Sequence, residues 1–389
     1  MTLLVVGASA AGLGTVEALR RKGYADRITV SGAEPHLPYD RPPLSKQVLS
    51  GLWEPSRTRL RPPERLSTLD AEFLLGDAAV SLDVRQRTVR TASGRTLTAD
   101  DVVIATGLRP RTLPGQDGLD GVHVLRTVED ALAIRTALLS SSRAVVVGDG
   151  VLGTEIAASA AVMGVPVTLA GPQPAPLAAQ FGPVVSELLA DLHTSRGVAL
   201  RLGAAVTGLD ARDGRVTGVR LETGEVLPAD VVVVAFGAAP ATEWLEDSGL
   251  ALANGVVCDS RCRAAEGVYA VGDVARWYHE TLDVAMRLEN RTNATEQAGH
   301  VAAVLLGEDR PYTPVPYFWT DQFDTKIHVH GTLFADAEMS IVEGSVAGSR
   351  FVAQYRRNGV VTGVLGWNMP KQARSRRPEL TGVLVGGKP

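Results

Sequence analysis

Lysine and cysteine are scarce in this sequence of 389 residues. Only five of the 39 basic residues are lysines, so each lysine merits attention, and Lys46 most of all. The two cysteines, Cys258 and Cys262, are too few for a disulfide framework, which favours a reducing cytoplasmic environment. The net charge of −4 gives no basis for binding to nucleic acid or to an anionic membrane.

The sequence also lacks a segment with the pattern of a signal peptide or a membrane span. Residues 1–7 contain no basic region, and their short apolar run soon becomes glycine-rich. The most apolar long stretch, residues 148–171, is interrupted by Asp149 and Glu155, so a buried strand, helix and strand explain it better than a span. We therefore expect a soluble cytoplasmic protein without a membrane partner.

Strand-like apolar runs alternate with helix-length segments, the pattern of an α/β protein with parallel sheets. The first unit is a strand, a helix and a strand at residues 3–6, 11–22 and 27–30. The same order recurs at residues 144–147, 152–163 and 165–169. Further buried strands are expected at 231–236 and 267–271, and short strands of a mixed or antiparallel sheet at 327–330, 340–342, 350–355 and 360–367.

Each unit carries a glycine-rich turn between its first strand and its helix. The first glycine allows a tight turn, the second allows close approach of a pyrophosphate, and the third lets helix and strand pack, while the helix start offers free N–H groups. A single such turn can simply end a strand, but two of them in duplicated units indicate two dinucleotide sites. The candidate residues are Gly7, Ser9, Ala10, Ala11 and Gly12, then Gly148, Gly150 and Gly153.

A ribose-binding carboxylate is expected at the end of the second strand of each unit. In the first unit Glu34 is the candidate, and a solvated loop charge is the alternative. The second unit ends in Gly171-Pro172-Gln173, with neither an acid nor an arginine for a 2′-phosphate. The choice between NADH and NADPH is therefore open.

Four further stretches carry a family resemblance, at residues 38–46, 105–111, 268–277 and 315–322. With the two glycine turns, they make the chain resemble the FAD-dependent ferredoxin reductases that feed electrons to bacterial cytochrome P450 and Rieske oxygenase systems. The Arg-Pro-Pro-Leu-Ser-Lys and Tyr-Phe-Trp segments are the narrowest of these motifs. The resemblance extends from residue 3 to about residue 370, and it implies FAD and either NADH or NADPH as cofactors.

The resemblance implies a role for individual residues. Asp273 would hydrogen-bond the ribityl chain, Arg41 would lie along the flavin, and Lys46 would sit near flavin N5, paired with Glu155. A positioned cation there stabilises charge that develops as hydride arrives. The alternatives are a helix N-cap for Asp273, an ordinary surface lysine for Lys46 and an ordinary helix glutamate for Glu155. The other residues carried over to cofactor binding are Ala105, Thr106, Gly107, Arg109, Gly237, Gly272, Glu289 and Trp319, the last with a plain core tryptophan as its alternative.

The sequence departs from the family pattern at several positions. Ala33 stands where many relatives carry the ribose acid, and Ser9 replaces the second glycine of the first turn. Arg291 stands in place of the usual tryptophan in the stretch beside the flavin. These departures leave two alternatives open: a flavin-dependent reductase or oxidase acting directly on oxygen or a small metabolite, and a degenerate, non-catalytic relative.

The sequence lacks the residue patterns of a disulfide reductase and of a metal site. Disulfide reductases of related fold keep a redox cysteine pair soon after the first helix, but residues 35–60 contain no cysteine. We expect structural or incidental roles for Cys258 and Cys262, and no metal at His328 and His330, because no further ligand spacing accompanies them. Hydride transfer needs no protein nucleophile, since the cofactors carry the chemistry.

These observations predict an α/β protein with two Rossmann-like dinucleotide-binding domains and a small α+β C-terminal domain. The predicted boundaries are 1–108 with 237–314 for FAD, 109–236 for NAD(P), and 315–389 for a C-terminal interface domain. The implied reaction passes hydride from nicotinamide C4 to flavin N5, and single electrons then go to an acidic [2Fe-2S] or similar ferredoxin. A basic docking face at Lys371, Arg374, Arg376 and Arg377 is one hypothesis, and a solvated tail is its alternative; the chain is expected to be a monomer or a homodimer.

Overall fold

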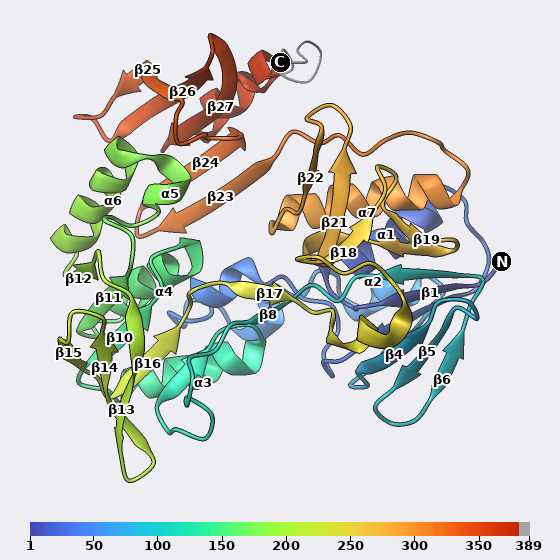
Figure 1. Cartoon of the computed structure of the whole chain (residues 1–389), viewed down its shortest axis with the longest axis horizontal. Coiled ribbons are helices and arrows are strands. Elements are labelled where there is room, and N and C mark those ends of the chain that lie inside the picture. Colours follow the sequence, from blue (N-terminus) through green and yellow to red (C-terminus); the bar gives the residue numbers. More distant parts are fainter. Residues whose placement is uncertain (381–389) are drawn as a thin grey trace.

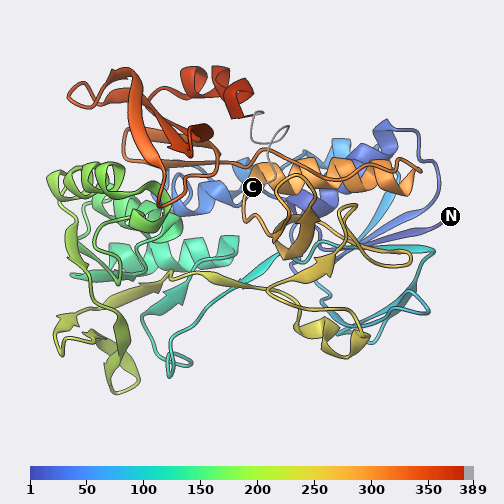
Figure 2. The ribbon, with the colours of Figure 1, turned by 45° about the horizontal axis from the view of Figure 1, so that its top comes forward.

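The computed structural model describes residues 1–380 of the chain. Two α/β lobes lie side by side, and a third, mostly β, unit lies above one of them (Figure 1). The view turned by 45° shows that the chain runs between the lobes in extended segments (Figure 2). Those segments include β8 (Leu108–Pro110) and β17 (Ala238–Pro240), which pair antiparallel.

The first lobe is built on a six-stranded sheet in the order β19-β20-β7-β1-β2-β3. Its central strand β1 is buried at all four residues, as expected for a parallel strand covered on both faces. Helices α1 (Ala10–Arg21) and α7 (Arg291–Leu305) pack against each other on this lobe. The strands are β1 (Leu3–Val6), β2 (Ile28–Gly32), β3 (Ala71–Leu75), β7 (Asp101–Ile104), β19 (Arg263–Ala265) and β20 (Val268–Ala270).

The second lobe repeats this plan with a five-stranded parallel sheet in the order β12-β11-β10-β16-β9. Helix α4 (Val151–Val162) follows β10 directly, as α1 follows β1. The strands are β9 (Val122–Val124), β10 (Ala144–Val147), β11 (Val167–Gly171), β12 (Ala199–Leu202) and β16 (Val231–Val234). The other helices of this lobe are α3 (Val128–Leu139), α5 (Ala178–Phe181) and α6 (Pro183–Ser195).

Within the described residues, three further sheets have three strands each. One contains β4 (Ala79–Asp83), β5 (Thr88–Thr91) and β6 (Thr96–Thr98). A second contains β13 (Val206–Arg212), β14 (Arg215–Leu221) and β15 (Val226–Pro228). The third contains β18 (Val256–Cys258), β21 (Ala275–His279) and β22 (Val284–Met286), and the short helix α2 spans Pro63–Ser67.

The C-terminal unit is a five-stranded antiparallel sheet in the order β23-β24-β27-β26-β25. It packs on the second lobe: Phe181 of α5 and Leu189 of α6 share a buried cluster with Ile327 and Phe351 of the sheet. The Tyr355 hydroxyl donates to the Phe181 carbonyl across this contact at 2.9 Å. The elements are β23 (Tyr317–Gln322), β24 (Thr325–Gly331), β25 (Glu338–Ser345), β26 (Arg350–Arg357), β27 (Val360–Trp367) and α8 (Pro370–Ser375).

The predicted fold class is confirmed, with small shifts at element ends. Strand β11 begins at Val167 rather than at residue 165, because Pro166 has no N–H to give to a ladder. Strand β23 was not among the predicted strands. The domain boundaries stay a prediction, and residues 381–389 of the last predicted domain lie outside the described residues. No helix within residues 1–380 is long and apolar enough to cross a membrane.

Candidate functional site

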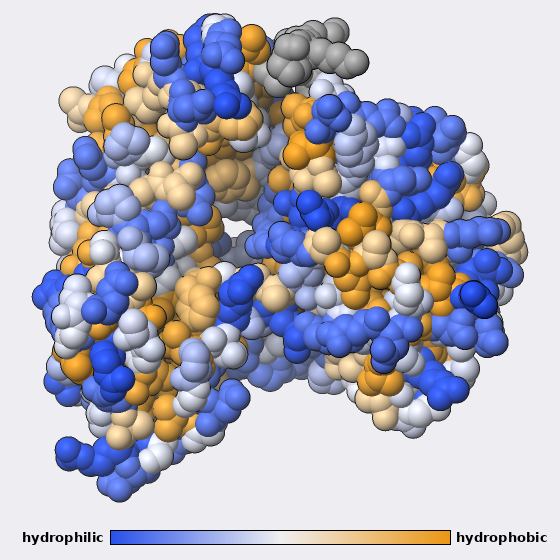
Figure 3. Space-filling view, in the orientation of Figure 1, coloured by the Kyte–Doolittle hydropathy of each residue, from blue (hydrophilic) through white to orange (hydrophobic). Residues whose placement is uncertain are grey.

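A cavity of about 1440 Å³ lies between the lobes and is lined by both of them and by β23. The space-filling view shows the molecule hollowed at this place (Figure 3). The volume exceeds the roughly 300–1,000 Å³ of a site for one drug-sized ligand. Both glycine turns open onto it, so the cavity can hold two extended ligands that meet between the lobes.

The first turn requires glycine for steric reasons. A Cβ on Gly7, whose φ is +120°, would lie 2.2 Å from the Ala105 carbonyl oxygen, and one on Gly12 would lie 1.9 Å from the Gly7 carbonyl oxygen. Ser9 precedes α1 but its side chain does not cap the helix. The first N–H groups of α1 are therefore left for a ligand in the cavity, which fits the pyrophosphate of a dinucleotide.

The second turn has the same construction. A Cβ on Gly148 would lie 2.4 Å from the Ala235 carbonyl oxygen, and one on Gly153 would lie 1.7 Å from the Gly148 carbonyl oxygen. At Gly150, by contrast, a Cβ would meet nothing within 4 Å, so this glycine leaves open space toward the cavity. The turn therefore also fits a pyrophosphate at the start of α4.

Glu34 lies in the cavity wall beyond β2, as the sequence predicts, but it is not a free loop charge. It forms an ion pair with Arg41 and accepts a hydrogen bond from the Tyr39 hydroxyl. Burial raises the pKa of Tyr39, so the phenol keeps its proton and remains a donor. Arg41 also donates to the Arg126 carbonyl, so that it links the loop after β2 to the loop that holds Arg126.

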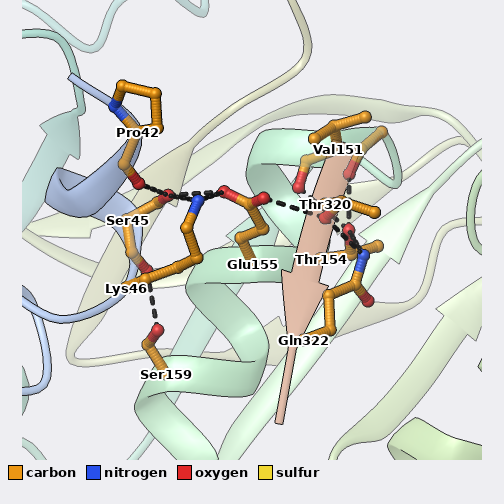
Figure 4. A network of polar contacts seen from close by, with 10 residues as sticks. Pro42, Ser45, Lys46, Val151, Thr154, Glu155, Ser159, Thr320 and Gln322 are labelled. Atoms are coloured by element: carbon orange, nitrogen blue, oxygen red, sulfur yellow. Dashed lines mark hydrogen bonds and ion pairs between the residues drawn. The ribbon is translucent and has the colours of Figure 1, made fainter. Parts of the chain in front are cut away.

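Lys46, from a segment between β2 and β3 that packs on the second lobe, meets Glu155 of α4 in the cavity wall (Figure 4). Their Nζ and Oε2 atoms are 2.8 Å apart, and the two side chains are only 12% and 6% exposed. Glu155 lies on α4 and accepts two more bonds, from the Ser45 hydroxyl and, at 2.8 Å, from the Thr320 hydroxyl. A buried carboxylate bound by three donors holds a cation in a fixed position.

Thr320 and Gln322 extend this network into the C-terminal unit. The Gln322 amide donates to the hydroxyls of Thr320 and Thr154, at 3.1 and 2.9 Å, and its carbonyl oxygen lies 2.7 Å from Nε2 of His193. Burial lowers the pKa of His193, which keeps the ring neutral. Sequence reasoning missed this network, although residues 320 and 322 alternate on one strand and so share a face.

Asp273 lines the cavity at the start of the segment that follows β20. Burial raises the pKa of its carboxyl group, and the nearby Arg126 opposes that rise. Burial also lowers the pKa of Arg126 to about 10. Arg126 was not identified from the sequence, because no motif marks the loop in which it lies.

Charged and aromatic residues form the rim of the cavity. Arg291 pairs with Asp40 at 2.6 Å, and Glu289 pairs with Arg287 at 2.7 Å. The Trp319 ring stacks on Tyr317 with ring centroids 5.9 Å apart, so its alternative as a plain core residue is wrong: it is half-buried and lines the cavity. The departure at Arg291 thus places a cation where the family pattern has an aromatic ring.

The structure brings most of the predicted site residues to this one cavity. Those in its wall are Gly7, Ser9, Ala10, Ala11, Glu34, Arg41, Lys46, Ala105, Thr106, Gly107, Arg109, Gly148, Gly150, Glu155, Gly237, Asp273, Glu289 and Trp319. Gly12, Gly153 and Gly272 do not line it. They lie behind the wall, where a Cβ would meet Gly7, Gly148 and Ala11 respectively, so they serve packing.

The cysteines and the paired histidines lie apart from this cavity. Cys258 and Cys262 are buried and free, and burial raises the pKa of the Cys262 thiol to about 12. His328 accepts or donates at the Tyr317 hydroxyl at 2.8 Å, and His330 stacks on the Tyr317 ring. Within residues 1–380 no group of three potential metal ligands occurs.

Comparison with known proteins matches two family models. Residues 1–298 match the pyridine nucleotide-disulphide oxidoreductase family, and residues 317–381 match the reductase C-terminal domain. Rhodocoxin reductase of Rhodococcus erythropolis is 34% identical over 379 residues, which cover 97% of this chain and 88% of that protein. Putidaredoxin reductase of Pseudomonas putida is 33% identical over 386 residues, which cover 97% and 91%.

Solved structures agree with these relatives. The ferredoxin reductase for the CYP199A2 system from Rhodopseudomonas palustris has a TM-score of 0.91 and 34% identity, over 94% of this chain and 91% of that one. The covalent putidaredoxin reductase–putidaredoxin complex gives a TM-score of 0.92 and 32% identity, over 98% and 93%. The chain belongs to the pyridine nucleotide-disulphide oxidoreductase family, among the ferredoxin reductases that carry a reductase C-terminal domain.

Proposed function

We propose that this protein is an FAD-dependent oxidoreductase that takes hydride from a nicotinamide nucleotide and passes single electrons to an iron–sulfur ferredoxin. The observation that carries the proposal is the buried Lys46–Glu155 pair, which lies in the wall of the cavity onto which both glycine turns open. A pair of this kind positions a charge at the place where two cofactors meet. A degenerate binding protein has no need of it.

The first lobe is the proposed site of FAD. The turn at residues 7–12 would hold the pyrophosphate at the start of α1, Glu34 the ribose, and Asp273 the ribityl chain. When bound, FAD accepts a hydride and gives up its electrons one at a time. The chain itself supplies binding, orientation and electrostatics.

Lys46 has the proposed task of stabilising negative charge near the reacting atoms. Its ammonium is held by Glu155, which is itself held by Ser45 and Thr320. Fixed charges in a water-poor site are worth more than the same charges in water, because they do not have to reorganise during the reaction. The C-terminal strand β23 therefore contributes to the reductive half-reaction through Thr320.

The partner is proposed to be a small iron–sulfur protein. The name of one relative assigns it to putidaredoxin, and another is the ferredoxin–NAD(+) reductase subunit of a benzene 1,2-dioxygenase system. A basic face on the C-terminal unit suits an acidic ferredoxin. Residues 370–380 form α8 and a 3₁₀ turn, so the disorder in the alternative of a disordered, solvated tail does not fit them, although most of their basic side chains are exposed to solvent.

The basic face itself is narrower than the sequence suggested. Arg376 is engaged by Glu379 at 3.1 Å and Glu343 at 3.8 Å, whereas Lys371, Arg374 and Arg377 are exposed. We expect Arg374→Glu with Arg377→Glu to raise the KM for an acidic ferredoxin several-fold at low salt and to leave flavin reduction unchanged. Steady-state ferredoxin reduction at two ionic strengths measures this. An unchanged KM and salt dependence would exclude this docking face.

We also propose a cytoplasmic location, which the two free, buried thiols support.

The test of the proposed activity is the oxidative half-reaction, in which the reduced flavin gives up its electrons. The protein is reduced anaerobically by a nicotinamide nucleotide and then mixed with an oxidised [2Fe-2S] ferredoxin or with oxygen. We expect ferredoxin to reoxidise the flavin much faster than oxygen does. Fast reoxidation by oxygen, with no response to ferredoxin, would favour the oxidase alternative and contradict the proposal.

A further inference from the structure

The glycine turn of the second lobe brings an acid to the end of strand β11. A Cβ on Gly171, at the end of β11, would lie 2.3 Å from Oδ2 of Asp149. The Asp149 carboxylate therefore occupies the space of the strand-end side chain that the sequence lacks. Asp149 is the middle residue of the Gly148-Asp149-Gly150 turn and lines the cavity.

The position of this carboxylate is fixed by Gln173. The backbone N–H of Gln173 donates to Oδ2 and its side-chain amide donates to Oδ1, both at 2.7 Å. The side-chain carbonyl oxygen of Gln173 in turn accepts from the Ala179 N–H at 2.7 Å. Each carboxylate oxygen has two acceptor sites and uses one of them here, so capacity remains for the two hydroxyls of a ribose.

Within residues 1–380, no lysine or arginine forms an ion pair with Asp149. The cations in the cavity wall are Arg41, Lys46, Arg109, Arg126, Arg287 and Arg291. Within the described chain, the wall residues from the second turn and from positions 172–180 include neither lysine nor arginine. A 2′-phosphate at this ribose would face a 5% exposed carboxylate without a counter-charge.

We propose that Asp149 is the ribose-binding carboxylate of the second lobe and that it makes the protein select NADH over NADPH. This inference rests on the proposed function, because it assigns the nucleotide of that same site. The hydroxyls of NADH donate to Asp149, whereas the 2′-phosphate of NADPH is repelled by it and finds no arginine. Asp149 is a specificity-determining residue and takes no part in hydride transfer.

The test is calorimetric binding of ADP-ribose and 2′-phospho-ADP-ribose to the FAD-loaded protein. These ligands carry the adenosine end of each nucleotide and no reactive nicotinamide, so the readout is independent of turnover. We expect the wild-type protein to bind ADP-ribose at least about tenfold more tightly. Asp149→Asn should reduce that ratio by about tenfold, because it removes the charge and keeps the side-chain shape.

Asp230→Asn is the matched control. Asp230 also accepts from two backbone N–H groups, of Ser142 and Arg143, but it lies outside the cavity, so the ratio should stay at the wild-type value. The double variant Asp149→Gly with Gly171→Glu should restore the preference for ADP-ribose, because it returns the acid to the strand end. This variant keeps the inference testable where Asp149→Asn fails to fold.

The outcomes separate the inference from the proposed function. Equal binding of the two ligands by the wild-type protein, or an unchanged ratio in Asp149→Asn, would overturn the role of Asp149 and leave a nicotinamide-dependent reductase intact. Failure of the FAD-loaded protein to bind either ligand, or to be reduced by either nucleotide, would instead overturn the proposed function. A wild-type preference for the 2′-phosphorylated ligand would contradict the inference directly.

Discussion

The two lobes share one backbone design, but the glycine turns differ in the charge they place beside the strand end. In both, a glycine turn packs against a strand-end glycine: Gly32 lies against Ala8 in the first lobe, and Gly171 lies against Asp149 in the second. The first lobe therefore has a methyl group where the second has a carboxylate. Duplicated turns thus keep the sterics that pyrophosphate binding needs, while the charge beside the ribose is free to vary.

The groups that bind the acid also differ between the two lobes. In the first lobe the acid is Glu34 from the loop after β2, and Arg41 and the Tyr39 hydroxyl bind it. In the second lobe the acid sits in the turn, and only an amide and a backbone N–H bind it. A neutralised acid suits a cofactor that stays bound, and an acid without a cation suits a nucleotide that must be chosen and released.

The steric requirement that the two turns share is strictest at the third glycine of each turn. Gly12→Ala places a Cβ 1.9 Å from the Gly7 carbonyl oxygen, a rigid backbone atom. We expect a loss of about 3 kcal/mol or more in unfolding free energy and a loss of bound flavin. Urea unfolding and the flavin absorbance of the purified protein measure both effects.

Gly299→Ala provides the control for that substitution. Gly299 lies in α7, and a Cβ there meets nothing within 4 Å. This helix should become more stable by about 0.5–1 kcal/mol, since alanine has the higher helix propensity. If Gly12→Ala were as harmless as Gly299→Ala, the steric account of the turns would be wrong.

The second prediction concerns the buried Lys46–Glu155 pair in the cavity wall. Lys46→Met removes the cation at the proposed meeting point of the cofactors, and we expect flavin reduction to slow by about a hundredfold with flavin still bound. Anaerobic stopped-flow mixing with NADH measures the rate. Lys326→Met, at an exposed position on β24, should leave the rate unchanged. A normal rate in Lys46→Met would sink the assigned role of the pair.

A smaller effect on the rate of flavin reduction is expected from a substitution in the C-terminal unit. Thr320→Val removes the hydroxyl that donates to Glu155 and should cost about 1 kcal/mol, a several-fold slower reduction, because one buried bond is lost. Thr320→Ser keeps the hydroxyl and should stay near the wild-type rate. The same stopped-flow assay compares the two, and equal slowing in both would mean that the contact is one of packing alone.

Much of this comparison could be predicted from the sequence. The glycine turns and the duplicated strand–helix–strand units depend on local periodicity or on short motifs. The pairing of Lys46 with Glu155 was implied by the family resemblance, and the structure shows it. Several element ends shifted by a few residues, as at β11, which begins after Pro166, and at β25, which spans Glu338–Ser345 rather than 340–342. The strand β23 escaped prediction, although its aromatic residues were noted.

The rest depends on contacts between segments far apart in the sequence. In the sequence alone, Asp149 is only a charge that interrupts an apolar stretch, because its contact with Gly171 depends on how the turn and the strand end are placed in space. Thr320 and Glu155 are 165 residues apart, and no spacing rule relates them. Arg126 lies in a loop without a motif. Packing between segments far apart in the sequence, rather than local pattern, determines these parts of the site.

The central claim is that the second lobe delivers hydride from an unphosphorylated nicotinamide nucleotide to a flavin in the first. Anaerobic titration of the purified protein with NADH and with NADPH, followed at the flavin absorbance, tests it most directly. The account predicts bleaching by NADH near stoichiometry and little response to NADPH at the same concentration. A yellow protein that neither nucleotide reduces would contradict the account, and preferential reduction by NADPH would contradict its assignment of Asp149.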